Sequence, residues 1–302
     1  MSIPVAYAVI IVVWSTTPLA IKWSAEGLSP VSGVFLRMLI ATCVGYLFIR
    51  MTKRKLRWDK EALQYYATAN LGLFFGLLLI YKASTFVASG LISVLFGLSP
   101  ILSGLLAQYI LEDSKFSGRQ WGALLLAVLG LAIVFSDQLS SGGSFSGDNV
   151  ALGLALILTS VFLFSFSGVL MTKLDVDMDA MSAVVGSLIT ALPLFFIAWV
   201  VTEGSIQFSN ISLALPSIIY LGVGGSLVGF ACYFYILQKM SATYASTVTL
   251  ITPVIALFLG SVLNGEVVTV SVGVGASFIC LGLFLFLSGG AAMNSKMMGD
   301  SD

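Results

Sequence analysis

Long apolar runs follow one another along almost the whole chain, and this pattern constrains the fold more than any other feature. A helix needs about 20 consecutive apolar residues to cross the hydrocarbon core of a bilayer. Ten runs approach this length, and because each is continuous rather than alternating, they predict transmembrane helices and not the strands of a β-barrel. The runs are Ile3–Lys22, Pro30–Ile49, Leu63–Ile80, Val87–Leu111, Gln120–Phe135, Ala151–Met171, Ala180–Thr202, Leu213–Leu237, Ala242–Leu263 and Val267–Ser288.

The composition excludes several other classes of protein. Hydrophobic residues make up 58% of the chain and charged residues 9%, against about 45–50% and about 25% in soluble domains. The formal net charge is zero, so nucleic-acid binding is not expected. Histidine is absent, and the three cysteines lie inside apolar runs without CxxC spacing. We therefore expect an all-α membrane protein that is not an enzyme and that holds no metal and no cofactor.

The basic residues predict the orientation of the helices. If both termini are cytoplasmic, all but three of the 14 Lys and Arg residues fall on the cytoplasmic side, as the positive-inside rule requires. The exceptions are Lys22, Arg37 and Lys82. We therefore expect a multi-pass protein whose N- and C-termini both lie in the cytoplasm.

The chain is also duplicated. A Gly- and Ser-rich stretch at residues 136–149 separates five apolar runs from five more. The spacing from Tyr81 to Glu112 is 31 residues, and so is the spacing from Tyr235 to Glu266. Since five helices are an odd number, the second half would insert upside down relative to the first. We expect a first repeat at residues 1–136, a linker at 137–150, an inverted repeat at 151–290 and a cytoplasmic tail at 291–302.

Inverted repeats are typical of secondary transporters, and the order of motifs resembles the ten-helix drug/metabolite transporter superfamily, specifically its EamA-like exporters. The departures are Ser15, where the family has Gly, and FSFSG at 164–168 in the sixth run, where the family has its usual aromatic segment. The motifs are WSTTPLAIK at 14–22, LSPVSGVFLRMLIA at 28–41, ASGLISVLFGLSPILSGLLAQYILED at 88–113 and QKMSATYASTVTLITPVIALFLGSVLNGE at 238–266.

The resemblance implies ten transmembrane helices, built as two inverted five-helix repeats around a central cavity. It implies export of amino acids or related small polar metabolites across a bacterial inner membrane by alternating access. We expect the first, third, fourth, sixth, eighth and ninth helices to line the cavity. The fifth and tenth helices carry few polar residues and should lie at the periphery.

Four prolines inside the runs mark candidate positions along the cavity. Pro18, Pro100, Pro193 and Pro253 each lack an N–H and free the carbonyl four residues earlier. A free carbonyl at membrane depth must be buried in protein or face a wet cavity. Because Pro100 and Pro253 occupy matching positions in the two halves, we expect both of them beside the cavity.

Helix periodicity divides the third run into two faces. Gly72 and Gly76 share one face and suit close helix contact, while Asn70, Phe74 and Tyr81 fall on the opposite face and suit a polar and aromatic pocket. Aromatic packing, with the amide of Asn70 bonded to a neighbouring backbone, is the alternative. The candidate substrate-binding residues are Trp14, Thr17, Arg37, Asn70, Phe74, Tyr81, Phe96, Ser99, Ser165, Tyr233, Thr249 and Thr252.

Charged residues give two further expectations. Arg37 lies about 10 Å below the outer edge of the second run, at about 1.5 Å per residue. A charge at this depth is paired or functional, and Glu26 is a candidate partner. No acidic residue falls in the middle of a run, so we expect a facilitator or exchanger with little direct proton coupling. The candidate gating or helix-breaking residues are Pro18, Lys82, Ala88, Pro100, Lys239, Ala242 and Pro253.

Two other functions remain open at this stage. An anion antiporter for phosphorylated sugars or nucleotide-sugars would need clustered cations, and the spans offer mainly Arg37. A non-transport membrane protein, which would be an intramembrane enzyme, a channel or a scaffold, leaves the inverted repeats without a purpose. The expected partners are a small-molecule substrate and the lipid bilayer, and the expected assembly is a monomer or weak homodimer.

Overall fold

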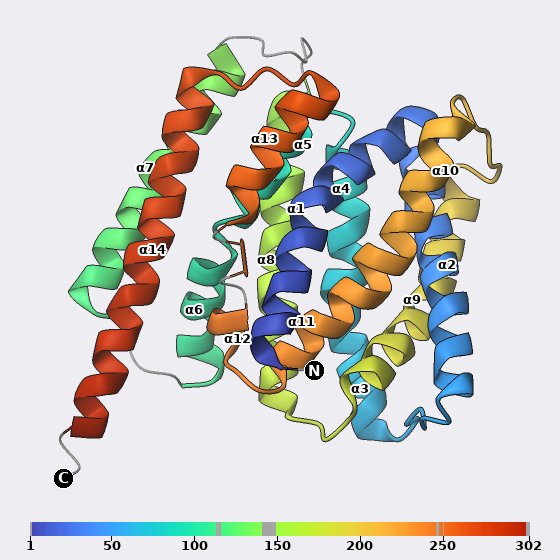
Figure 1. Ribbon diagram of the computed structural model, residues 1–302, viewed down its shortest axis with the longest axis horizontal. Helices are drawn as coiled ribbons and strands as arrows, with labels where there is room; N and C mark the ends of the chain where they lie inside the picture. Colours follow the sequence, from blue (N-terminus) through green and yellow to red (C-terminus); the bar gives the residue numbers. More distant parts are fainter. Residues whose placement is uncertain (1, 113–115, 141–148, 246–247, 250, 300–302) are drawn as a thin grey trace.

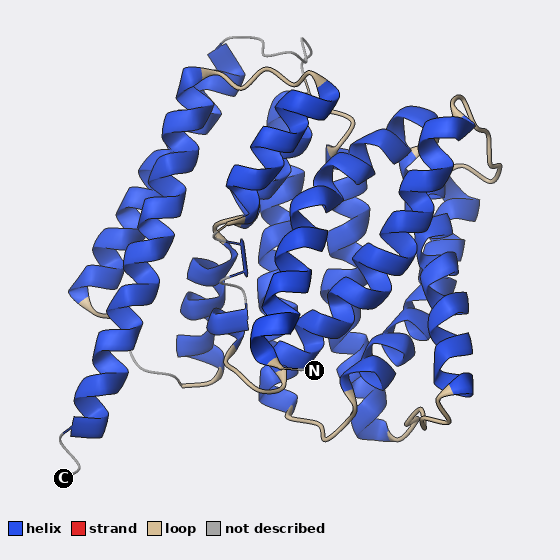
Figure 2. Ribbon diagram, viewed as in Figure 1, coloured by secondary structure: helices blue, strands red, loops and turns tan. Residues whose placement is uncertain are grey.

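A computed structural model describes residues 2–112, 116–140, 149–245, 248–249 and 251–299 (Figure 1). All regular elements of these residues are helical (Figure 2). In chain order they are α1 (Ile3–Gly27), α2 (Pro30–Met51), α3 (Lys60–Asn70), η1 (Leu71–Gly76), α4 (Leu77–Ala83), α5 (Ser89–Phe96), α6 (Ser99–Ile110), α7 (Gly118–Ser140), α8 (Val150–Leu174), α9 (Ala180–Thr202), α10 (Ile211–Tyr220), η2 (Leu221–Gly229), α11 (Phe230–Leu237), α12 (Ala242–Ala245), α13 (Thr252–Asn264) and α14 (Val270–Gly299).

Length and apolar character divide the helical segments into two groups. The segments long and apolar enough to cross a membrane number seven among the described residues, which makes this a multi-pass membrane protein. They are Ile3–Gly27, Pro30–Met51, Lys60–Ala83, Ser89–Ile110, Val150–Leu174, Ala180–Thr202 and Ile211–Leu237. Three further apolar stretches, at Gly118–Val134, Thr252–Asn264 and Val270–Phe286, overlap the fifth, ninth and tenth runs of the sequence. The first and third of them belong to the longer helices α7 and α14.

The prolines act in two different ways. Pro100 and Pro253 each lie in the first turn of a new helix, α6 and α13, where a missing N–H leaves no intrahelical bond unmade. The fourth and ninth apolar runs are therefore interrupted helices. By contrast, Pro18 and Pro193 lie inside α1 and α9, which continue through them without a break.

Two stretches of π-helix, η1 and η2, interrupt the third and eighth apolar runs. Both are rich in glycine, and neighbouring side chains occupy the space that the missing Cβ atoms leave. A Cβ on Gly76 would lie 2.7 Å from Cε2 of Phe164 in α8, and a Cβ on Gly222 would lie 2.9 Å from Cγ2 of Ile40 in α2. These glycines therefore allow close contacts between helices, as we predicted for the face that carries Gly72 and Gly76.

The helices α7 and α14 pack side by side along one edge of the molecule (Figure 1), where the fifth and tenth runs were expected. The other helices surround α1, which contacts α10, α11 and α13. Helical structure continues past two of the predicted repeat ends, because α7 extends to Ser140, with residues 141–148 outside the described part, and α14 extends to Gly299. The repeat boundaries themselves stay a prediction.

Two loops at one end of the molecule are bonded to each other. Arg54 forms an ion pair with Asp179 at 2.5 Å, and Nη1 of Arg57 donates a hydrogen bond to the carbonyl of Asp177 at 2.9 Å. Nε of Arg57 also pairs with Asp59 at 2.8 Å, and this hydrogen bond holds the pKa of the Asp59 carboxyl at about 2. The loops after α2 and α8 therefore share one side of the molecule, where the sequence expects both to be cytoplasmic.

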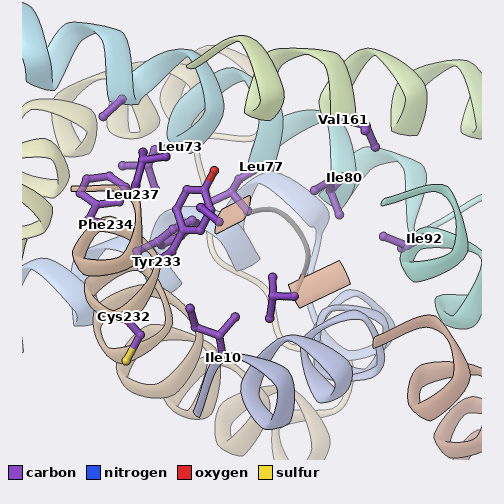
Figure 3. Close-up of a cluster of buried hydrophobic side chains, with 14 of the residues drawn as sticks. Ile10, Leu73, Leu77, Ile80, Ile92, Val161, Cys232, Tyr233, Phe234 and Leu237 are labelled. Atoms are coloured by element: carbon purple, nitrogen blue, oxygen red, sulfur yellow. The ribbon is translucent and has the colours of Figure 1, made fainter. Parts of the chain in front are cut away.

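The largest buried cluster lies between the two halves of the chain (Figure 3). Tyr233 and Phe234 of α11 lie near Leu73 and Leu77, which belong to η1 and α4. Ile10 of α1 approaches the same cluster from another side. This packing between segments far apart in the sequence holds the walls of the cavity described next.

Candidate functional site

A central cavity lies among the helices, with about 760 Å³ of empty space that includes its opening to solvent. Its walls come from α1, α2, α4, α5, α6, α8, α11 and α13. All the helices expected to line it contribute, and α2 adds Arg37.

Aromatic rings form most of one wall. The ring of Trp14 lies 5.3 Å from that of Tyr233 and 6.1 Å from that of Phe230, measured between centroids. The ring of Phe164 stacks on Phe230 at 6.2 Å and meets Phe96 edge-on at 5.7 Å. Because each ring is held by its neighbours, the wall is a preorganised surface for the apolar part of a ligand.

Residues with hydroxyl groups also line the cavity. They are Thr17, Ser93, Ser99, Thr249 and Thr252. Two of them occupy matching positions in the two halves, because Ser99 opens α6 and Thr252 opens α13. The interrupted helices therefore bring their first residues to the cavity. The remaining lining residues are apolar and comprise Pro18, Ile21, Leu77, Ile80 and Ile92.

Arg37 supplies the charge in this cavity, and its side chain is almost fully buried at 1% exposure. Its Nε donates a hydrogen bond to Oγ of Ser226 at 2.8 Å, and its guanidinium lies 5.9 Å from the ring centre of Tyr81. The expected pairing with Glu26 is wrong, because none of the ion pairs among the described residues includes Arg37. Ser226 and Tyr81 hold the guanidinium toward the interior instead.

The structure brings many of the predicted binding residues to one place. Their roles in binding stay a prediction, but the cavity collects side chains from segments more than 200 residues apart. The predicted residues that line it are Trp14, Thr17, Pro18, Arg37, Phe96, Ser99, Tyr233, Thr249 and Thr252. Ser165 does not line the cavity itself, but its hydroxyl forms a hydrogen bond of 3.1 Å with the hydroxyl of Ser99, which does.

Asn70, Phe74 and Tyr81 of the third run do not line the cavity, and their contacts favour the packing alternative. Nδ2 of Asn70 donates a hydrogen bond to Oγ1 of Thr190 at 3.0 Å, and Phe74 packs edge-on against Phe195 at 4.8 Å, so both side chains face α9. Tyr81 is fully buried beside Arg37. The π-helix η1 lies between Asn70 and Tyr81, so its wider turns change the register between these two residues from that of a regular α-helix. A role of these residues in binding stays a prediction.

Sequence reasoning missed several residues of the site. Phe164 and Phe230 complete the aromatic wall, and Ser226 holds Arg37. A signal for Phe164 was present, because it directly precedes the predicted Ser165 in the FSFSG segment. Ser226 lies 189 residues from Arg37 and is one of many serines in apolar runs, so no local pattern distinguishes it.

One end of the bundle is closed by hydrogen bonds. The carboxylate of Glu266 accepts from the backbone N–H of Ser89 at 3.0 Å and of Gly90 at 3.2 Å, the first residues of α5. Lys22 reaches across to the carbonyl of Ser84 at 2.9 Å. Glu112, the counterpart of Glu266, is exposed, and no hydrogen bond joins it to another described residue.

The opposite end has a cleft of about 640 Å³, bounded in part by Tyr65, Asp175 and Lys239. The predicted gating residues lie at both ends. Nζ of Lys239 lies 5.4 Å from the ring centre of Tyr235, and Ala242 is buried at the start of α12. At the closed end, Lys82 lies 5.7 Å from the ring centre of Phe86 and Ala88 directly precedes α5. Gating by these residues stays a prediction.

The EamA-like transporter family model matches the chain twice, over residues 2–136 and again over residues 151–288. The chain belongs to this family. The EamA-like chain is 25% identical to an uncharacterized transporter of Archaeoglobus fulgidus, over 93% of its own length and 97% of the relative's. It is 26% identical to the uncharacterized transporter YoaV of Bacillus subtilis, covering 90% and 92% of the two chains.

Two further similarities extend this comparison. The uncharacterized inner membrane transporter YedA of Escherichia coli is 23% identical over 84% of this chain and 80% of its own. A solved crystal structure superposes with a TM-score of 0.70 over 94% of this chain and 96% of its own, at 15% identity, which shows a shared fold. The EamA-like chain is therefore a membrane transporter.

Proposed function

We propose that this EamA-like protein exports small polar metabolites, such as amino acids or related compounds, by alternating access. The observation that carries the proposal is the central cavity, which lies between an end of the bundle joined by the hydrogen bonds of Glu266 and Lys22 and an opposite end with a separate cleft. Aromatic rings and hydroxyl groups in its wall suit a small molecule with both apolar and polar parts. A central site closed on one side is the arrangement that alternating access requires.

We also propose that ten transmembrane helices form two inverted repeats, with both termini in the cytoplasm of a bacterial inner membrane. The two matches of the family model support the repeats, and the name of the similar YedA protein supports the inner membrane. The joined loops after α2 and α8 support a common side for both, where Arg54 and Arg57 would satisfy the positive-inside rule. The protein would work in the bilayer as a monomer or weak homodimer.

Single cysteines test this topology in a background without the three native cysteines. One is placed in the loop at residues 52–60, and another in the segment at 136–149, most of which lies outside the described residues. A membrane-impermeant maleimide added to intact cells should label the second position and spare the first. Equal labelling of the two positions from outside would reject the proposed orientation.

Transport into proteoliposomes tests the function itself. The purified protein is reconstituted and offered a panel of radiolabelled amino acids, nucleobases and quaternary amines. Trp14→Ala removes the ring at the centre of the aromatic wall and should slow uptake of the transported solute by about fivefold, because a ring contact of this kind contributes about 1 kcal/mol beyond its burial. Trp121→Ala, which changes an exposed tryptophan on α7, is the matched control and should transport normally.

A further inference from the structure

We propose that Arg37 anchors a carboxylate of the transported molecule. The substrates would then be small carboxylic acids, zwitterionic or singly anionic, with an apolar body. This inference rests on the proposed transport function and specifies the chemistry of the same cavity. It is carried by the charge of the wall, by the bonding of the guanidinium and by the apolar surroundings.

The charge of the cavity wall favours an anionic ligand. Arg37 is the single charged residue among those described as lining the cavity, which include neither Asp nor Glu. It also takes part in none of the ion pairs formed by the described residues. A buried cation without a counter-ion is costly at membrane depth. An anionic group entering the cavity would supply the missing opposite charge.

The guanidinium of Arg37 also has a hydrogen-bond donor that the protein does not use. Nε is used by Ser226, whereas Nη1 is buried and has no hydrogen-bond partner among the described residues. A Cβ on Gly225 would lie 3.2 Å from Nη2 and 3.6 Å from Oγ1 of Thr17, so this glycine leaves room near both groups. An unused donor of a planar guanidinium suits a carboxylate oxygen.

The surroundings restrict the rest of the ligand. Phosphate esters carry about two charges and are bound by several cations, and the described wall offers Arg37 alone. A ligand with only a positive charge would be repelled by Arg37 and would meet no acidic side chain in this wall. The rings of Trp14, Phe164 and Phe230 would pack against a branched or aromatic body. A small carboxylate with an apolar side chain satisfies these conditions together.

Three probes that share the side chain of leucine test the proposal. Their binding to the purified full-length protein is measured in detergent. Leucine carries a carboxylate and an ammonium group, 2-hydroxy-4-methylpentanoate keeps the carboxylate alone, and leucinamide keeps the ammonium group alone. Binding is read as the shift in melting temperature against probe concentration. We expect the two carboxylates to bind at least about tenfold more tightly than leucinamide, because a hydrogen bond to a charged group contributes about 1.5–3 kcal/mol, and about 1.4 kcal/mol is a factor of ten.

Variants on a single helix separate the role of Arg37 from general effects of charge. Arg37→Gln should remove the preference for carboxylates, and Arg37→Lys should keep part of it because the charge remains. Arg50→Gln, which changes an exposed arginine on the same helix α2, is the matched control and should bind as the unmodified protein does. If Arg37→Gln does not fold, the comparison of the three probes on the unmodified protein still decides the proposal.

Two results would overturn the inference. One is binding of leucinamide by the unmodified protein as tightly as leucine, and the other is no binding of either carboxylate together with binding of a different class of solute. Transport of leucine by Arg37→Gln at the unmodified rate would also reject the anchor. That last result would leave the proposed transport function intact, so the two proposals fail separately.

Discussion

Single side chains at the ends of helices connect parts of the chain that are far apart in sequence. The carboxylate of Glu203 accepts hydrogen bonds from the hydroxyls of Ser29 and Ser32, and from the backbone N–H of Ser32 at 2.8 Å. Asp59 and Asp179 accept from the first backbone N–H groups of α3 and α9 in the same way. Each carboxylate therefore satisfies donors that the start of a helix leaves unpaired.

The Asp59 cap predicts how one loop responds to acid. Its hydrogen bond from Arg57 holds its pKa at about 2, below the ordinary value of 3.8. A depressed carboxyl pKa stabilises the fold fully above about pH 3.8, and this contribution is lost as the pH falls toward 2. Asp59→Asn should therefore speed hydrogen exchange of the Ala62 amide at neutral pH and flatten its response to acid between pH 4 and pH 2.

The exchange experiment has a matched control in the neighbouring loop. Asp177 is exposed and contributes its backbone carbonyl to Arg57, so Asp177→Asn should keep the exchange profile of the unmodified protein. Identical profiles for Asp59→Asn and the unmodified protein would show that this carboxylate does not stabilise the start of α3.

The sequence predicts which types of side chain meet in the cavity better than it predicts the hydrogen bonds and ion pairs that these side chains form. Trp14, Ser99 and Thr252 stand out by their positions near prolines or in matching halves, and each lines the cavity. The bond from Arg37 to Ser226 was not predictable, because a contact across 189 residues depends on the packing of α2 against η2. The nearest acidic residue in sequence, Glu26, was the wrong partner.

Helix contacts in this molecule depend on glycine at particular positions. Gly186 of α9 faces the ring of Tyr66 in α3, where an added Cβ would lie 2.2 Å from Cζ. The Tyr66 hydroxyl is fixed by a hydrogen bond to the carbonyl of Arg57 at 3.0 Å, so the ring cannot easily move aside. A Cβ on Gly122 of α7, in contrast, would meet no described atom within 4 Å.

This contrast predicts opposite effects of the same substitution. Gly186→Ala should lower the free energy of unfolding by about 1–3 kcal/mol through overpacking. Gly122→Ala should leave it unchanged or raise it by up to about 1 kcal/mol, because alanine favours the helix. Reversible denaturation of both variants in detergent measures the difference. Equal stabilities would show that α3 and α9 separate at little cost.

Among the helices, the sequence marked the important prolines but did not predict which of them interrupt a helix. Pro100 and Pro253 stood out by their matching positions and begin new helices, whereas Pro18 and Pro193 lie in helices that continue through them. The π-turns of η1 and η2 carry no signature in the sequence, since glycines also suit ordinary close packing. A regular α-helix assumed through η1 therefore gives the wrong register between Asn70 and Tyr81.

Considered as a whole, the molecule is closed at one end by Glu266, and its counterpart Glu112 is exposed at the other. Losing a helix cap costs about 1 kcal/mol, which corresponds to about a fivefold change in a population. Glu266→Ala should therefore open this end more often. In a background without native cysteines, Ser89→Cys, which is 1% exposed at present, should react about fivefold faster with an impermeant maleimide.

Glu112→Ala is the matched control for this opening, because it removes the same group from the other half of the chain. It should leave the reaction rate of the cysteine at position 89 unchanged or lower. An equal acceleration by both variants would indicate general loosening of the bundle and would count against a latch at Glu266.

The cavity also bears on the driving force of transport. Its described lining contains no carboxyl group, and the chain has no histidine, so no group beside the substrate changes protonation near neutral pH. We expect an imposed pH gradient alone to drive no accumulation of a solute that does not itself titrate, in proteoliposomes with a clamped membrane potential. Accumulation under these conditions would reject exchange or facilitated transport without direct proton coupling.

The interruption before Pro253 has a consequence for how the protein is made. The helix α13 has 13 residues and is therefore about 20 Å long, whereas the hydrocarbon core is about 30 Å thick. On its own, α13 is shorter than the about 20 residues that a spanning helix needs. It contacts α1 and α5, and both of those helices are synthesised much earlier. We therefore expect the order of synthesis to matter, because the last part of the chain would pack on a surface that the first part has already built.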